Sequence, residues 1–213
     1  MSKILPGETD LYALTDARLS RGRSLRQVVE ALLDQDIRII QYREKHLPSR
    51  VMFEECQLMR ELTTKHKACF IVDDHVDLAI ASHADGVHIG QDDLPIEAVR
   101  KLVGSNMLIG VSTHAPEQAL AAQKAGADYI GVGPIFATKT KEDVCAPVGL
   151  SYLEWVVANI TIPFVAIGGI KEHNIAQVTR SGAKCCALVS EFVGADNIGE
   201  KVQRVRTAMH QSV

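Results

Sequence analysis

A short polar segment carries an amide and two fixed positive charges at alternate positions. Gln41, Arg43 and Lys45 follow one another at intervals of two residues, at the end of an apolar run. Alternate residues of a β-strand point to the same face of a sheet, so these three side chains would project together. The spacing predicts an anion-binding site, and the alternative is a run of solvated surface charges.

Two pairs of aspartates follow two later apolar runs. Asp73-Asp74 ends one run, and Asp92-Asp93 comes shortly after the next. Mg²⁺ takes oxygen ligands and usually keeps only one or two protein carboxylates, with water and phosphate supplying the rest. Asp is also a favoured N-cap residue. We therefore expect one aspartate of each pair to cap the following helix, and Asp74 and Asp93 to hold Mg²⁺ against a phosphate group.

A long segment over residues 133–149 alternates hydroxyl and amine side chains, which suit phosphate oxygens. The alternation runs through Thr138, Lys139, Thr140 and Lys141. A loop of this length in a compact domain is usually functional or disordered. We expect it to close over bound ligand as a lid, so that trypsin cleaves more slowly at Lys139 or Lys141 when pyrophosphate and Mg²⁺ are present.

Small and hydroxyl residues end three further runs. Gly169 follows the seventh run and Val189-Ser190 ends the eighth, where barrels often bind phosphate through backbone N–H groups. Ser112 ends the fifth run and would either hydrogen-bond a ligand or cap the following helix, because no surrounding motif indicates a nucleophile. His114, two residues later, is the candidate general acid or base.

All these residues fall at the ends of eight short apolar runs, and the runs predict the fold. They are rich in Ile and Val, as expected for parallel strands covered on both faces. Between them, apolar residues recur every three or four positions, which is the spacing of amphipathic helices. The predicted strands are Leu11–Thr15, Arg38–Arg43, Cys69–Asp73, Gly86–Gly90, Leu108–Ser112, Tyr129–Gly133, Phe164–Gly168 and Cys185–Ser190. The predicted helices are Leu25–Leu33 with Ser24 as N-cap, Met52–Leu62, Val76–Ala81, Ile96–Val103, Pro116–Lys124, Leu150–Val157, Ile175–Thr179 and Val202–Met209.

Three helix-to-strand junctions look like copies of one another. In each, a small residue is followed by one suited to a left-handed cap, at His83, Gly126 and Gly182. This repeat, together with eight strands, predicts a (β/α)₈ TIM barrel formed by residues 1–213 as one domain. The alternative is a doubly wound open sheet, against which the first run lacks a following glycine-rich phosphate loop.

Composition narrows the class of protein. The chain has 213 residues, of which 46% are hydrophobic and 23% charged, and its formal net charge is −3. These values exclude a disordered or coiled-coil chain, and the charge balance argues against nucleic acid or an anionic membrane as partner. No apolar stretch approaches the ~20 residues of a membrane span. The 5 cysteines show no CxxC spacing, so we expect buried thiols and a cytoplasmic protein.

Seven segments, in order and over nearly the whole chain, resemble the motifs of the thiamine-phosphate synthase family. They are Gln41–Lys45, Asp73–Ala79, Ala84–Pro95, Gly110–His114, Tyr129–Phe136, Thr138–Lys141 and Ala166–Ile170. The resemblance implies a TIM barrel and a transferase of thiamine biosynthesis. Its reaction would join 4-amino-2-methyl-5-(diphosphooxymethyl)pyrimidine to a thiazole ethyl phosphate, giving thiamine phosphate and pyrophosphate with Mg²⁺ as cofactor. A homodimer is the expected assembly of the protein.

The resemblance also assigns residues to these ligands. The pyrimidine diphosphate would contact Gln41, Tyr42, Arg43, Glu44, Lys45, Asp73, Ser112 and Lys141, and Mg²⁺ would be held by Asp74 and Asp93. The thiazole phosphate would contact Thr138, Lys139, Thr140, Gly169, Val189 and Ser190. Catalysis would fall to Arg43, Lys45 and Lys141, which neutralise the leaving group, and to Ser112.

The chain departs from the family pattern at one position, because Asp73 stands where the family has Asn. An ionised carboxylate accepts hydrogen bonds but donates none. Asp73 can therefore accept from the pyrimidine amino group, but it adds negative charge beside the diphosphate. We expect Asp73→Asn to lower KM for the pyrimidine substrate; if Asp73 caps the next helix instead, the change is nearly neutral.

Two alternatives stay open from sequence alone. A related barrel would tautomerise a carboxythiazole phosphate with His114 as acid–base and without a metal, and a non-catalytic barrel would bind the same ligands as a regulator. The Asp74 and Asp93 pair argues against the first. The retention of both the carboxylates and the cationic loop argues against the second.

Overall fold

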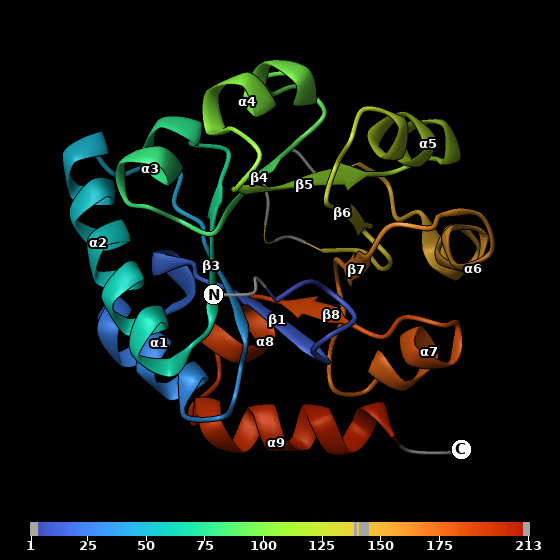
Figure 1. Ribbon diagram of the computed structural model, residues 1–213. Helices are drawn as coiled ribbons and strands as arrows, with labels where there is room; N and C mark the ends of the chain where they lie inside the picture. Colours follow the sequence, from blue (N-terminus) through green and yellow to red (C-terminus); the bar gives the residue numbers. More distant parts are fainter. Residues whose placement is uncertain (1–3, 139, 141–144, 211–213) are drawn as a thin grey trace.

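Eight parallel strands close into a barrel in which each strand pairs with the next and β8 pairs with β1 (Figure 1). The structure is a computed structural model and describes residues 4–138, 140 and 145–210. The strands are β1 (Leu11–Leu14), β2 (Ile39–Tyr42), β3 (Cys69–Asp73), β4 (Gly86–Ile89), β5 (Leu108–Thr113), β6 (Tyr129–Val132), β7 (Phe164–Ile167) and β8 (Cys186–Leu188). The predicted (β/α)₈ barrel is confirmed, and the open sheet is wrong.

Helices surround the barrel on its outside (Figure 1). They are α1 (Leu25–Leu33), α2 (Ser49–His66), α3 (Val76–Ala81), α4 (Ile96–Val103), α5 (Pro116–Lys124), α6 (Gly149–Asn159), α7 (Ile175–Arg180), α8 (Ser190–Val193) and α9 (Ile198–Met209), with a short 3₁₀ helix at Ala17–Leu19. The 3₁₀ helix and α8 were not predicted, because three or four residues are too few to show a helical period. None of the described helices is both long and apolar enough to span a bilayer.

Local predictions at the helix ends hold in part. Ser24 caps α1 through a capping box with Gln27, and His83, Gly126 and Gly182 have φ of 54°, 87° and 101°, so the three junctions share a left-handed turn. The aspartate pairs do not cap, because α3 begins after His75 and α4 after Pro95 without a side-chain cap bond. That expectation was wrong.

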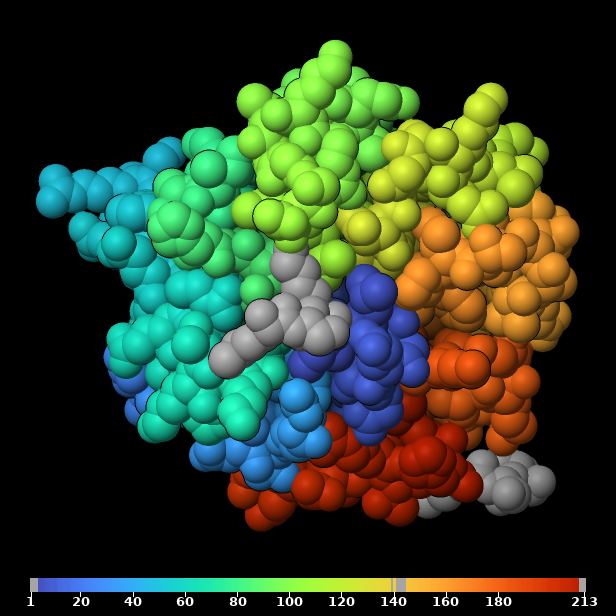
Figure 2. Space-filling model, in the orientation of Figure 1, coloured from blue at the N-terminus to red at the C-terminus, as the bar shows by residue number. Residues whose placement is uncertain are grey.

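The apolar core has two layers. A large cluster lies between the barrel and its helices, and a smaller one fills the barrel interior, with Ile4 and Leu5 packed against it from the chain start. Figure 2 shows the blue N-terminal segment across the centre of the face in view. Because this segment leads into β1, it covers the N-terminal end of the barrel and leaves the C-terminal end as the mouth.

The Asp85 carboxylate links three elements by hydrogen bonds at the N-terminal end of the barrel. Asp85, just before β4, accepts hydrogen bonds through Oδ2 from the Phe70 N–H of β3 at 2.8 Å and from Arg60 of α2 at 2.9 Å. The charge of the Arg60 guanidinium strengthens this bond relative to a neutral one. The aspartate of the repeated junction thus ties a strand, its neighbour and a helix together.

The second junction repeats the arrangement. Asp128, just before β6, accepts from the Ile109 N–H of β5 at 2.7 Å and from Arg100 of α4 at 2.6 Å. A related ion pair joins the last helix to the first strand, because Arg206 of α9 donates to Asp10, just before β1, at 2.8 Å. We call the contacts of Asp85 and Asp128 the aspartate junctions.

Removing one aspartate junction should destabilise the fold. Asp128→Ala leaves the Ile109 N–H and Arg100 without this acceptor, and an unsatisfied buried donor costs about 1–3 kcal/mol. Urea unfolding at neutral pH measures the loss. Asp34→Ala, which removes an exposed carboxylate at the end of α1, is the matched control and should change the free energy of unfolding by less than about 0.5 kcal/mol. Equal stability of the two variants would contradict the role of the junction.

The cysteines largely follow expectation. Cys56, Cys69, Cys185 and Cys186 are buried free thiols, whereas Cys145 is exposed. Burial raises the pKa of Cys56 and of Cys186 to about 12, so these two thiols stay protonated and unreactive at neutral pH.

Candidate active site

Polar residues from neighbouring strands meet at the mouth of the barrel. Ile39 of β2 and Ile71 of β3 belong to the interior core. Counting on in twos along these strands reaches Arg43 and Asp73, which therefore face the interior as well. The structure thus brings together the side chains that the alternation of the sequence placed on one face.

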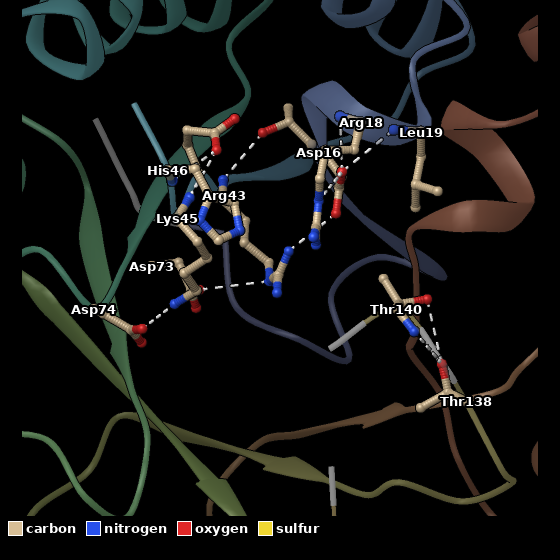
Figure 3. Close-up of polar contacts among 12 residues, drawn as sticks. Asp16, Arg18, Leu19, Arg43, Lys45, His46, Asp73, Asp74, Thr138 and Thr140 are labelled. Carbon is tan, nitrogen blue, oxygen red and sulfur yellow. Dashed lines mark hydrogen bonds and ion pairs between the residues drawn. The ribbon is translucent and has the colours of Figure 1, made fainter. Parts of the chain in front are cut away.

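Arg43 is held between two carboxylates. Its Nη1 donates to Asp16 Oδ2 at 3.1 Å, and its Nε lies 3.8 Å from Asp73 Oδ2 (Figure 3). Its backbone N–H donates to Thr15 Oγ1 at 3.0 Å. The side chains of Arg43 and Asp16 are only 9% and 3% exposed. They form a buried ion pair, which fixes the orientation of the Arg43 guanidinium.

Lys45 lies among the neighbouring carboxylates. Its Nζ is 3.0 Å from Asp73 Oδ2 and also pairs with Asp74 (Figure 3). Burial alone would lower the pKa of Lys45, but Asp73 and Asp74 outweigh it and raise that pKa, so the amine stays charged. Glu44 supports the turn, because its Oε1 accepts from the N–H groups of Lys45 and His46.

Asp74 and Asp93 form the predicted carboxylate pair. The Asp74 backbone is left-handed at φ 60°, and its N–H donates to the His88 carbonyl at 2.8 Å. Asp93 Oδ2 accepts from the Gly90 N–H at 2.6 Å. Partial burial raises the pKa of Asp93, and the nearby Asp74 carboxylate adds to the rise. The two neighbouring carboxylates repel each other when both are ionised, so a cation bound between them would be stabilised.

The donor set suits a magnesium ion rather than a soft metal. Both members are carboxylates, which are ligands that Mg²⁺ prefers. Within the described part of the chain, no group of three or more His, Cys, Asp or Glu is arranged to hold a metal. A hard cation held by two carboxylates and the phosphate oxygens of a ligand fits these residues; a metal bound by protein alone does not.

Ser112 lies at the inner end of the mouth. Its Oγ is 3.0 Å from His88 Nε2, and Gln91 Nε2 donates to its carbonyl at 2.6 Å. The next helix, α5, begins after Ala115, so Ser112 is not its cap. The half-buried hydroxyl is placed for contact with a ligand at the mouth.

Tyr42 and Glu44 are placed differently from the rest of their segment. The Tyr42 side chain belongs to the layer between barrel and helices and donates to Glu55 of α2 at 2.5 Å. The Glu44 carboxylate is used by the backbone of its own turn. The structure therefore does not bring the Tyr42 side chain to the mouth, because it occupies the outward position of the alternation.

The second group of phosphate-suited residues lies apart from the first. Figure 3 shows Thr138 and Thr140 well away from Lys45 and Asp74. Thr138 Oγ1 accepts from the Thr140 N–H at 3.3 Å, so the two hydroxyls lie in one turn. Lys139 and Lys141, which carry the expected trypsin sites of the lid, lie outside the described residues.

Gly169 is explained by the chain itself. Its φ is 64°, and a Cβ there would lie 2.6 Å from the Ala137 carbonyl oxygen and 2.7 Å from that of Phe136. The sequence placed Gly169 where barrels often bind phosphate, but the atoms that approach it closely are carbonyls of the segment after β6. Val189 follows β8 and Ser190 begins α8, so the predicted strand Cys185–Ser190 is too long at this end. The Val189 carbonyl accepts from the Phe192 N–H of α8 at 3.0 Å.

His114 has a structural partner. Its Nδ1 lies 2.5 Å from the Gly133 carbonyl, to which it donates, and its N–H donates to Gln118 Oε1 at 2.7 Å. The ring thereby links the segment after β5 to the end of β6, at the cis Gly133–Pro134 bond.

Sequence reasoning missed two residues of the site. Asp16 comes two residues after the end of β1 and so obeys the strand-end rule that located the other carboxylates. His88 occupies an interior position of β4, in register with Asp73 and with Gly110 on either side. A histidine inside an apolar strand, opposite a glycine on the next strand, was the signal that could have found it.

Comparisons with known proteins agree over nearly the whole chain. The family model described as thiamine monophosphate synthase matches residues 11–192. The thiamine-phosphate synthase of Lawsonia intracellularis is 58% identical over 212 residues, 98% of each chain. That of Pelotomaculum thermopropionicum is 61% identical over 199 residues, 93% of this chain and 91% of the relative.

A solved structure gives the same result. The thiamine phosphate pyrophosphorylase from Pyrococcus furiosus superposes with a TM-score of 0.84 at 38% identity, covering 93% of this chain and 94% of its own. A 3-hexulose-6-phosphate synthase, at 19% identity and a TM-score of 0.65, shares the barrel fold. The model match, the identities and the superposition together show that the chain belongs to the thiamine monophosphate synthase family.

Proposed function

We propose that this chain joins an aminopyrimidine methyl diphosphate to a thiazole ethyl phosphate, giving thiamine phosphate and pyrophosphate. Membership of the family supports the reaction. The observation that carries the proposal is the separation of two polar groups: the ionic cluster at β2–β4, and the turn after β6 that holds the hydroxyls of Thr138 and Thr140. Two such groups suit two phosphorylated substrates. The tautomerase-like and regulatory alternatives are not favoured, since relatives at up to 61% identity are thiamine-phosphate synthases.

The residues at β2–β5 would stabilise the leaving group. The C–O bond to the diphosphate would break as the pyrimidine amino group stabilises positive charge at the methylene. The thiazole nitrogen would then form the N–C bond with its own lone pair, so no strong base is needed. Negative charge then grows on the pyrophosphate, beside the fixed cations Arg43 and Lys45. Charges already positioned where charge develops are among the largest contributions to catalysis. Ser112 would add one hydrogen bond, and Lys141 remains a prediction from sequence.

Asp74 and Asp93 are the residues we propose as Mg²⁺ ligands. Asp73, Asp74 and Asp93 gather around Lys45, so carboxylates outnumber cations at the place where a diphosphate would bind. When bound, Mg²⁺ would stabilise the negative charge of the diphosphate as a Lewis acid. The excess of carboxylates supports this role, because the two cations alone would not offset both the carboxylates and the substrate.

A direct assay tests the reaction and the metal separately. The purified protein is mixed with both substrates, with Mg²⁺ or with excess chelator, and thiamine phosphate and pyrophosphate are measured. We expect equal amounts of the two products with Mg²⁺ and almost none with chelator. No product under any condition would refute the proposed reaction. Full activity in chelator would refute the metal and leave the transferase.

Asp73→Asn should improve binding of the pyrimidine diphosphate. Asp73 does not cap α3, so its charge competes with the diphosphate for Lys45 and Arg43. The interaction of Asp73 with these cations, which the ligand must displace, contributes about 0.5–1 kcal/mol. Removing it predicts a KM for the pyrimidine diphosphate that is lower by about 2- to 5-fold at saturating Mg²⁺. Steady-state kinetics check this. An unchanged KM would show that the Asp73 charge is fully compensated before the ligand binds.

The same variant should not lose stability. Burial raises the pKa of Asp73, as does Asp74, against the opposing effect of Lys45 and Arg43. An acid whose pKa is raised on folding costs stability when it is ionised, so Asp73→Asn should be at least as stable at neutral pH. The difference should shrink as the pH falls below the raised pKa, where Asp73 takes up a proton.

Cellular setting and assembly complete the proposal. We place the reaction in the cytoplasm, because four buried free thiols suit a reducing compartment. Assembly as a homodimer stays a prediction, and light scattering of the purified protein in solution tests it.

A further inference from the structure

Four polar side chains form a chain of hydrogen bonds through the barrel interior to Ser112. Tyr12 Oη lies 3.1 Å from Tyr129 Oη, Tyr129 Oη lies 3.1 Å from His88 Nδ1, and His88 Nε2 lies 3.0 Å from Ser112 Oγ. Tyr12 and Tyr129 are 2% and 1% exposed. The inner three residues have no part in the proposed reaction, yet they occupy the core just beneath the mouth.

The neighbouring strand leaves room for this contact. Gly110 of β5 stands in register with His88 of β4 and with Tyr129 of β6. A Cβ at Gly110 would lie 2.5 Å from His88 Nδ1 and 2.2 Å from Tyr129 Cζ. A side chain of any kind at position 110 would therefore push the tyrosine and histidine apart.

The hydrogen bonds of the chain have a direction. A neutral imidazole has one nitrogen that donates and one that accepts. The protons of this hydrogen-bonded series therefore all point inward, toward Tyr12, or all point outward, toward Ser112. If they pointed inward, Tyr12 would end the chain with a buried O–H, and Tyr129 is its hydrogen-bond partner among the described residues. If they point outward, Tyr12 donates to Tyr129 and every buried hydroxyl proton has an acceptor. A buried donor without an acceptor is costly, so the outward direction is favoured.

The ionisation of the two tyrosines agrees with this direction. Burial raises the pKa of both Tyr12 and Tyr129. The hydrogen bond between them raises the pKa of Tyr12 further but lowers that of Tyr129. A hydrogen bond opposes ionisation of its donor and favours ionisation of its acceptor, which fits Tyr12 as donor.

We propose that Tyr129 donates to His88 Nδ1 and so holds the ring in the tautomer protonated at Nε2, which leaves the Ser112 hydroxyl proton for an oxygen of the bound diphosphate. Nε2–H donates to Ser112 Oγ, and Ser112 then cannot donate to the ring. The Ser112 hydroxyl could otherwise donate or accept a hydrogen bond. His88 and Tyr129 are thus positioning residues, because they fix Ser112 as a donor toward the mouth. The identity of the ligand rests on the proposed function; the tautomer does not.

Nitrogen NMR of the free protein tests the tautomer directly. The ring resonances of ¹⁵N-labelled protein are recorded at a pH where His88 is neutral and are assigned by their loss in His88→Gln. We expect a protonated Nε2 and an unprotonated Nδ1. The opposite tautomer would overturn the proposal, whatever the protein catalyses.

Two tyrosine variants test the consequence. Tyr129→Phe removes the donor to Nδ1 and should let Ser112 donate to the ring. We expect the Nε2–H tautomer to be lost, and the Kd for pyrophosphate in the presence of Mg²⁺ to rise by about 10-fold or more, as for a lost hydrogen bond to a charged group. Tyr152→Phe is the matched control, because the Tyr152 hydroxyl donates to Thr113 of the same strand β5 at 2.8 Å but lies in the helix layer.

The outcomes separate the two proposals. An unchanged tautomer and Kd in Tyr129→Phe would overturn the positioning role, as would an equal loss of affinity in Tyr152→Phe, which would indicate general damage to β5. Wild-type protein that binds no pyrophosphate would count against the proposed function, and the NMR result on the tautomer would still stand.

Discussion

Asp74→Asn is expected to lower kcat by roughly 10²–10³-fold, the size of effect found when one preorganised charge contact to a developing anion is removed. Asparagine keeps the shape of the side chain and tolerates the left-handed backbone at this position, where φ is 60°. It loses the charge that Asp74 would offer to a metal ion. Alanine would add backbone strain to the lost charge, so asparagine is the sharper variant.

The measurement is kcat as a function of Mg²⁺ concentration, together with thermal unfolding. The half-saturating Mg²⁺ concentration should rise, and the Tm should stay near that of the wild type because a carboxylate at the mouth is not part of the core. Asp92→Asn is the matched control, since Asp92 is an exposed aspartate beside Asp93. A near-normal kcat in Asp74→Asn, or an equal loss in Asp92→Asn, would remove Asp74 from the metal site.

Asp16→Ala is expected to destabilise the fold by about 3 kcal/mol, the lower end of the range for breaking a buried ion pair by removing one partner. Among the described residues, the loss leaves Arg43 buried with only Asp73, at 3.8 Å, to offset its charge. The variant also loses the carboxylate that caps the 3₁₀ helix by accepting from the Arg18 and Leu19 N–H groups. Urea unfolding measures the change in the free energy of unfolding.

A double variant separates the ion pair from the cap. Arg43→Met removes the stranded charge and keeps most of the side-chain volume, so Asp16→Ala with Arg43→Met should recover part of the stability lost in Asp16→Ala. Asp16→Asn keeps an acceptor for the cap and should fall between the wild type and Asp16→Ala. No recovery in the double variant would place the whole effect in the cap.

The fold could be predicted because two patterns in the sequence are strong: the apolar runs of the strands and the three-to-four-residue spacing of the helices. Strands covered on both faces carry almost no polar residues, so the eight runs stood out, and α1, α3, α4 and α5 have the predicted bounds. The cap assignments of the aspartate pairs failed because other donors competed for these carboxylates, one from the segment after β2 and one from the turn after β4. The Lys45 amine and the Gly90 N–H offered these carboxylates better partners than the helix ends did.

The site was predictable to the extent that it lies at strand ends on the inward face. Arg43, Lys45, Asp73 and Asp74 meet as their spacing required. Tyr42 shows where this prediction fails. The family resemblance assigned every residue of the segment 41–45 to the ligand, but alternate side chains of a strand point to opposite faces, and Tyr42 points outward. The chain from Tyr12 to Ser112 was out of reach, since its members come from four strands and their contacts depend on the register between them.

The aspartate junctions bear on the order in which the barrel folds. Asp85 and Arg60 are 25 residues apart in sequence, and Asp128 and Arg100 are 28 apart, whereas Asp10 and Arg206 are separated by 196. Closing a short loop costs less chain entropy than closing a long one, so both junctions can form within partial chains, and the Asp10–Arg206 pair must wait until the first and last elements meet. Joining the chain ends would bring Asp10 and Arg206 to within about 20 residues of each other, so a circular permutant reopened between the two junctions should form this pair early and should close its barrel last between β4 and β5.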